Sequence, residues 1–150
     1  MTKVRRFLAV LLVLALGAGV AACGSDSDSG SGEGSEASAV EGVTWQAMNL
    51  VTQGAATSLP KGVKPPTLEI NDGQASIFAG CNSGSGEATV NEATIDFGPI
   101  ALTRKSCEQV QNQIEFLVTQ VLQGEVKYEV DSDGNLILEK GTDSIVYTKG

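Results

Sequence analysis

Apolar residues follow three different patterns along this chain. Between Phe7 and Val20 they form a nearly continuous run of 14 residues, whereas residues 24–42 hold six serines, five glycines and five acidic residues. From residue 43 onward, apolar residues alternate with polar ones or recur at intervals of three and four. These patterns predict a leader over 1–22, a flexible tether over 23–42 and a single folded domain over 43–150.

The strongest helical pattern lies between residues 106 and 123. Six apolar residues fall there on one helical face, and they are Val110, Ile114, Leu117, Val118, Val121 and Leu122. Ser106 and Gln109 have the spacing of a capping box, and Gly124 is a natural residue to end the helix. We predict one helix at about 107–123, with its apolar stripe packed on a sheet.

Short strands are predicted on both sides of this helix. The segments with strand-like patterns are Val43–Val51, Leu68–Asn71, Gln74–Ala79, Ala88–Val90, Ala93–Phe97, Val126–Val130, Leu136–Glu139 and Ser144–Thr148. Residues 52–66, which contain three prolines, and the glycine-rich segment Gly80–Gly86 are expected to be loops. The expected fold class is α+β, a small antiparallel sheet or half-barrel of about seven or eight strands with one helix packed on it.

Composition removes several classes of function. The chain has no histidine, which excludes Ser-His and Cys-His catalysis and histidine-ligated metals. With 18 acidic and 10 basic residues, its net charge is −8 at pH 7, which argues against nucleic acid as a partner. We therefore expect a protein that is not an enzyme and needs no cofactor, and we nominate no catalytic or metal-binding residue.

One short motif resembles a catalytic signature. Ser58 and Lys61 have the S-x-x-K spacing of serine acylases. That chemistry needs the serine at the start of a helix with the lysine one turn later, and Pro60 and Gly62 prevent such a helix. We interpret the match as chance.

A second motif resembles half of a calcium loop. Glu129, Asp131, Asp133 and Gly134 have the spacing of its first positions, but Lys140 stands where a bidentate glutamate is required. We interpret this segment as an acidic hairpin tip between two strands. Weak calcium binding by the Asp131/Asp133 turn stays open.

The leader has the successive regions of an export signal. Three basic residues at positions 3, 5 and 6 precede the apolar run, which is shorter than the roughly 20 residues of a membrane span. The run ends in Val20-Ala21-Ala22-Cys23, which resembles the lipobox of bacterial lipoproteins. The resemblance implies cleavage after residue 22, lipidation of Cys23 and a location on the extracytoplasmic side of the cell membrane. An ordinary secretory cleavage site with a free Cys23 is the alternative.

Two cysteines remain if Cys23 is lipidated. Cys81 and Cys107 then have one possible pairing. An exported protein can keep such a disulfide, and closing this loop would stabilise the domain by roughly 3.5 kcal/mol in the chain-entropy model. Two buried free thiols are the alternative. A reactive thiol is disfavoured because the chain has neither a histidine nor Cys-x-x-Cys spacing.

The folded part carries an ordered set of short motifs. They are Gly80-Cys81-Asn82 with Gly86, Thr103-Arg104-Lys105-Ser106-Cys107, Phe116-Leu117, Tyr128, Asp133-Gly134, Leu136-Ile137-Leu138, Gly141 and Ile145-Val146-Tyr147, with Trp45 near the start. In this order they resemble the META domain, the HslJ-like family of small extracytoplasmic proteins, over about residues 43–148. A departure is the Ser-Gly-Ser-Gly stretch after Asn82, where the family often has a bulky residue. The resemblance implies a fold and an association with the cell envelope and with stress, and it brings no catalytic residues.

We therefore expect a lipid-anchored, extracytoplasmic, non-enzymatic META-type domain with a binding or accessory role at the cell envelope. Its expected partners are the membrane, through the anchor, and an envelope protein or ligand that the sequence does not identify. The alternative is an acidic inhibitor of a basic envelope or secreted enzyme. That alternative follows from charge, because residues 23–150 hold 7 basic and 18 acidic side chains, a difference of −11.

Overall fold

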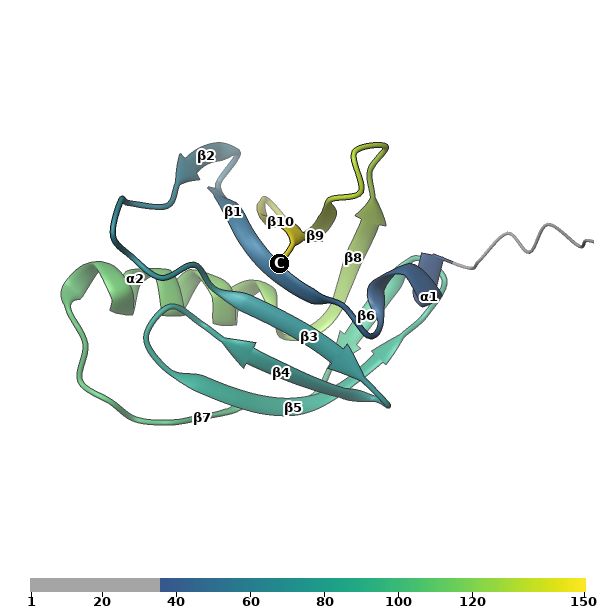
Figure 1. Ribbon diagram of the computed structural model, residues 1–150, viewed down its shortest axis with the longest axis horizontal. Helices are drawn as coiled ribbons and strands as arrows, with labels where there is room; N and C mark the ends of the chain where they lie inside the picture. The colour runs from purple at the N-terminus through teal and green to yellow at the C-terminus, as the bar shows by residue number, and fades with distance from the viewer. Residues whose placement is uncertain (1–35) are drawn as a thin grey trace, which may run out of the picture. The chain divides into compact units, whose positions relative to one another are not determined.

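Eight strands within residues 36–150, the part that this computed structural model describes, close into an antiparallel barrel (Figure 1). In chain order they are Thr44–Thr52 (β1), Thr67–Asn71 (β3), Gln74–Phe78 (β4), Ser83–Val90 (β5), Thr94–Phe97 (β6), Gly124–Val130 (β8), Leu136–Lys140 (β9) and Asp143–Lys149 (β10). Each pairs with the next in this order, and β10 pairs with β1 to close the ring. The expected α+β class is confirmed, and the sheet is a complete barrel rather than a half-barrel.

Two short strands and two helices lie outside the ring. Ala55–Ser58 (β2) pairs with β1, and Ala101–Leu102 (β7) pairs with β5. The helices are Glu36–Val40 (α1) and Gln109–Val121 (α2). Neither described helix has the length and apolar character needed to cross a membrane. The expected leader, its lipobox and Cys23 lie outside the described residues.

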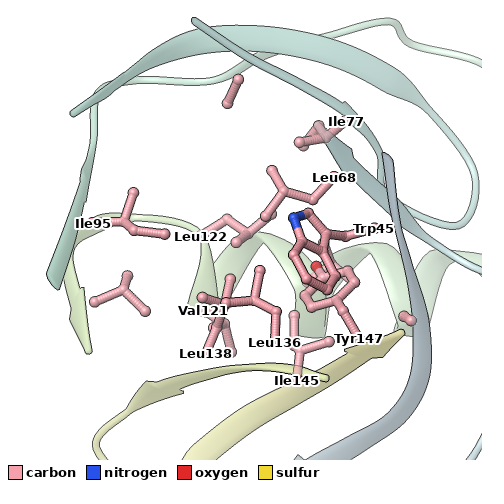
Figure 2. Close-up of a cluster of buried hydrophobic side chains, with 14 of the residues drawn as sticks. Trp45, Leu68, Ile77, Ile95, Val121, Leu122, Leu136, Leu138, Ile145 and Tyr147 are labelled. Atoms are coloured by element: carbon pink, nitrogen blue, oxygen red, sulfur yellow. The ribbon is translucent and has the colours of Figure 1, made fainter. Parts of the chain in front are cut away.

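The barrel interior is filled by alternate residues of its strands. Buried apolar side chains stand two positions apart, as in Leu68 and Ile70 or Leu136 and Leu138, because successive side chains of a strand point to opposite faces. In Figure 2, side chains from β1, β3, β9 and β10 converge on one space. The alternation from which the strands were predicted is therefore the alternation between the inside and the outside of the barrel.

A β-bulge in β1 explains an irregularity in this alternation. Ala47 pairs with Tyr147 and Asn49 pairs with Val146, so Met48 is an extra residue in the ladder with β10. The extra residue restores the inward direction for Leu50, which is buried although it lies three positions after Ala47. Met48 itself is 45% exposed.

Helix α2 packs its apolar stripe into the barrel core, as predicted. Ile114, Val118, Val121 and Leu122 are buried, and the helix contacts β9 and β10. Figure 2 shows Val121 and Leu122 among the side chains of the barrel strands. The helix therefore closes the core from the side that the strands leave uncovered.

The ends of α2 differ from the expected ones. The helix begins after Glu108, whose backbone N–H donates to the Gln111 side chain (3.1 Å), so the capping box starts two residues later than Ser106. The preceding residues are held away from helical geometry because Lys105 and Cys107 are bonded to another loop. At the other end, Gly124 has a φ of 61° and starts β8 instead of serving as the C-cap.

The glycine-rich segment Gly80–Gly86 is only partly a loop. Its second half belongs to β5, where Gly84 and Gly86 lie beside residues 99–102. A Cβ at Gly86 would be 2.8 Å from the Pro99 carbonyl oxygen, and one at Gly84 would overlap the carbonyl oxygen of Ala101. These glycines permit a close approach of two chain segments, and the prediction of a loop was wrong for Ser83–Gly86.

The expected loop at 52–66 contains strand β2. All four of its residues are exposed, so they show no alternation that could have predicted a strand. In the turn before β2, Gln53 and Gly54 have φ values of 52° and 78°. These values allow the chain to reverse so that β2 pairs with β1. The rest of the segment leads to β3 without regular structure.

The folded part reaches back into the range 23–42 that was predicted to be a tether. Val40, in α1, is fully buried, and its carbonyl oxygen accepts a hydrogen bond from Trp45 Nε1 (2.9 Å). Gly42 donates its N–H to the carbonyl oxygen of Ile70 (2.9 Å). The prediction of a flexible tether was therefore wrong for Val40, which buries its side chain and supplies the acceptor for the buried indole N–H of Trp45.

Core packing of α2 can be tested with neighbouring residues. Ile114→Ala should lower the free energy of unfolding by about 2–5 kcal/mol, because it removes buried methyl groups and leaves a cavity. Gln113→Ala, at an exposed position of the same turn, should change it by a few tenths, since alanine is the better helix former. Urea denaturation midpoints measure both. Equal shifts for the two variants would contradict the burial assigned to Ile114.

The N-terminal boundary can be tested with two deletions of equal length. Deleting 32–42 removes Val40 and the hydrogen bonds to Trp45 and Ile70, and should lower the free energy of unfolding by about 2–4 kcal/mol. Deleting 24–34 removes only serine, glycine and acidic residues and should leave it nearly unchanged. Denaturation midpoints of both variants give the comparison. A neutral 32–42 deletion would show that the domain does not need α1.

Candidate functional site

The two motifs around the cysteines meet at the buried side chain of Asn82. Its Oδ1 accepts hydrogen bonds from Thr103 Oγ1 (2.9 Å) and from the backbone N–H of Lys105 (2.7 Å). Its Nδ2 donates to Glu115 Oε1 (3.3 Å), and its backbone N–H donates to Glu115 Oε2 (2.7 Å). We call Asn82, Thr103, Lys105 and Glu115 the Asn82 brace. It ties the β4–β5 loop to the segment before α2 and to α2 itself.

A disulfide joins Cys81 to Cys107 beside this brace. The Cα atoms are 6.0 Å apart, within the usual range for a disulfide. The structure thus contains the pairing that was expected, rather than two free thiols. The disulfide connects the same two segments as the hydrogen bonds of the Asn82 brace. The β4–β5 loop and the segment before α2 are therefore linked twice.

Gly80 lets α2 come close to the same loop. Its φ is 109°, a conformation that other residues rarely adopt. A Cβ at this position would also lie 2.6 Å from Ile114 Cγ2. Glycine is therefore needed both for the turn and for the contact with the helix.

The Asn82 brace is built to hold segments together. A buried amide can satisfy both its oxygen and its nitrogen here, and the carboxylate of Glu115 receives two of the bonds. Sequence reasoning identified Asn82 and Thr103 and missed Glu115, which lies 33 residues from Asn82. The one available signal was that Glu115 is the only charged residue in α2.

The acidic hairpin tip between β8 and β9 is organised by Asp131. Its Oδ1 accepts from the backbone N–H groups of Asp133 and Asn135 (both 2.9 Å), and its Oδ2 accepts from Asn135 Nδ2 (3.0 Å). These bonds, with that from the Asn135 backbone the largest contribution, hold the pKa of Asp131 below its usual value. The carboxylate thus stabilises its own turn. Within residues 36–150, no three Cys, Asp or Glu side chains are placed to share a metal ion.

The remaining motif residues take other places. Ser58 ends the exposed strand β2, and Lys61 lies in the turn that follows it, so the S-x-x-K residues are not on a helix. Lys140, which occupies the glutamate position of the calcium pattern, donates from Nζ to the carbonyl oxygen of Gln123. It therefore supports the junction between α2 and β8.

The outward side of α2 forms a shallow groove. It is lined by Gln109, Asn112, Gln113, Phe116 and Leu117. Phe116 is 62% exposed and, with Met48, is one of the two large apolar residues that are exposed within the described part of the chain. We call these five residues the amide face. Its members recur at intervals of three and four, and Leu117 joins them to the edge of the apolar stripe. The sequence contained this pattern, and it was not singled out.

The META domain family model matches residues 38–149. The chain belongs to the META domain family. The match starts within α1, which agrees with the burial of Val40. The predicted family resemblance is thereby confirmed, and it extends a few residues further at its N-terminal end.

Two solved structures share the fold of this META domain. A protein from Burkholderia xenovorans, solved by NMR, is 21% identical, with a TM-score of 0.63, and the match covers 76% of this chain and 86% of that one. A second NMR structure is 16% identical, with a TM-score of 0.61 and coverage of 75% and 92%. At these identities the likeness concerns the fold alone. No curated protein sequence matches the chain significantly.

Aromatic residues of the META domain motifs serve the fold. Trp45 and Tyr147 are fully buried in the barrel, and Tyr128 donates its hydroxyl hydrogen bond to the carbonyl oxygen of Asn91 (2.9 Å). The Tyr147 hydroxyl has no partner among the described residues, and burial raises its pKa above the usual value. These residues belong to the core and its rim rather than to a reactive site.

The Asn82 brace can be tested by removing its central amide. Asn82→Ala should lower the free energy of unfolding by about 2–3 kcal/mol, because it removes the acceptor of Thr103 and Lys105 and one of the two bonds to Glu115. Asn91→Ala, in the exposed β5–β6 hairpin, is the matched control and should be close to neutral. Thermal and urea unfolding measure both. A neutral Asn82→Ala variant would refute the bracing role.

Proposed function

We propose that this META domain is held at the extracytoplasmic face of the cell membrane by lipidated Cys23 and acts there by binding rather than by catalysis. The observation that carries the proposal is the order of segments: a basic start, an apolar run and Val20-Ala21-Ala22-Cys23, followed by a serine- and glycine-rich acidic stretch that leads to α1. Linkers rich in serine and glycine give a domain reach from its anchor without forming a core of their own.

The disulfide supports the proposed compartment. A bond between Cys81 and Cys107 persists in oxidising surroundings outside the cytoplasm and is rare within it. Its position next to the Asn82 brace gives it a structural role that an exported domain can use. The pairing leaves Cys23 as the cysteine available for an acyl anchor.

The use of the motif residues supports binding over catalysis. Asn82, Thr103 and Glu115 bond to one another, and the carboxylate of Asp131 bonds to its own turn. These groups are committed to the fold, so a partner is more readily met by exposed side chains outside the motifs. An accessory role at the envelope, including under stress, follows from the family resemblance.

Charge supports a second candidate, an acidic inhibitor of a basic envelope or secreted enzyme. The folded residues 43–150 hold 7 basic and 13 acidic side chains, a difference of −6. Such a charge steers encounters with a cationic partner, and the rate gain is lost as salt is added. Affinity capture from solubilised envelope at low and high salt separates the two: release of one cationic enzyme by salt favours the inhibitor, and salt-insensitive capture favours the first proposal.

Lipidation can be tested directly. Cys23→Ala should block acylation and processing after residue 22, because no thiol remains to take the diacylglyceryl group, so the protein should have the mass of the uncleaved, unacylated chain. Phase partitioning and intact mass measure the result. The double variant Cys81→Ser, Cys107→Ser should still be acylated and controls for loss of cysteine in general. Wild-type mass and detergent partitioning for Cys23→Ala would overturn the anchor.

A further inference from the structure

The five residues of the amide face carry no charge. Glu115 is the only charged residue within α2, and its carboxylate is turned to Asn82 in the Asn82 brace. The outward positions carry glutamine, asparagine and phenylalanine instead. The domain as a whole has an excess of acidic residues, but this surface gives a charged partner no electrostatic attraction. An uncharged partner can therefore bind there without losing contacts to charged side chains.

The side chains of the amide face offer two complementary kinds of contact. Phe116 presents an exposed ring whose face can take an apolar surface. Gln109 and Gln113 make no side-chain hydrogen bond to another described residue, and each amide can donate and accept at once. Asn112 is held in place because its Nδ2 donates to the carbonyl oxygen of Cys107 (3.2 Å). One amide is therefore pre-oriented, which lowers the cost of binding.

The size of the amide face limits what it can bind. A helix of 13 residues is about 20 Å long and about 10 Å wide, so one side offers roughly 200 Å². A stable protein interface needs about 800 Å² from each partner. The face is too small to hold a second copy of this domain and is long enough for a narrow chain laid along the helix.

We propose that the amide face binds a neutral oligosaccharide chain. Sugar rings have an apolar C–H face that stacks on an aromatic ring such as Phe116, and hydroxyl groups that donate to and accept from amides such as Gln109 and Gln113. An uncharged glycan also suits a face without charge. The inference deepens the proposed binding role and rests on it, since it names the class of partner.

The placement of the face suits a domain tethered at its N-terminal end. In Figure 1, α1 lies at one end of the described domain, and the first turn of α2, with Gln109, lies toward the opposite end. The start of the described domain and the first residues of the amide face are therefore at different ends of it.

Affinity electrophoresis of the full chain, purified in a neutral detergent, tests the inference. The probes are three neutral polysaccharides in native gels: soluble starch, hydroxyethyl cellulose and glycol chitin. At least one should retard the wild type, and Phe116→Ala should raise the apparent dissociation constant about tenfold, or about 1.4 kcal/mol. Gln113→Ala should raise it as well. Met48→Ala, which removes the other exposed apolar side chain, should leave retardation unchanged.

Several results would overturn the inference. They are the absence of retardation by all three probes, an equal loss for Met48→Ala, and a sedimentation shift showing that Phe116→Ala dissolves a dimer. The assay uses purified protein, so it does not depend on how Cys23 is processed. Absence of glycan binding by a protein that is anchored through Cys23 would refute this inference alone. Glycan binding by a Cys23→Ala protein that keeps the wild-type mass and detergent partitioning would refute the anchor alone.

Discussion

Strands β1 and β10 pair at six positions, and the barrel is closed only by this contact between the two ends of the folded chain. All other neighbours in the ring follow one another along the sequence, except that β2 lies between β1 and β3, and β7 and α2 lie between β6 and β8. Without the β1–β10 pairing, both strands would present open edges, which is costly for a small sheet. The bulge at Met48 belongs to this closure, because it keeps Trp45 and Leu50 on the inner face while β1 bends around the core.

The closed ring also requires that the segment connecting β6 to β8 be held in a defined position. These strands are neighbours in the barrel, yet residues 98–123 leave the ring of eight strands between them to form β7 and α2. This segment places the apolar stripe of α2 in the core. The stripe can take that position only if the residues before α2 are themselves held in place. The Asn82 brace and the disulfide provide that fixation, since both bind residues 103–107 to the loop at Cys81. The glycines of β5 allow the same segment to run close to the sheet.

The sequence was informative wherever a single element determines its own pattern. The stripe from Ile114 to Val121 and the alternation along β3, β9 and β10 could be read directly, because burial on one face sets the period. Features that depend on a residue distant in the sequence could not be predicted in this way. Gly84 appears as loop material until residues 99–102 lie against it, and Val40 appears to be part of a tether until the indole of Trp45 is placed. Glu115 shows no sign of its role until Asn82 is buried beside it.

The motif residues of the META domain family in this chain serve the fold, and this limits what they indicate about function. The residues by which the META domain was recognised, among them Asn82, Thr103 and Tyr147, are engaged in bracing or in the core. Shared residues of this kind maintain a fold without prescribing a reaction, so relatives can differ in activity while keeping every motif. Fewer constraints of this kind act on side chains that point away from the core, as on the outward side of α2. There the inner positions are fixed by packing and Glu115 by its hydrogen bonds to Asn82, whereas Phe116 remains exposed.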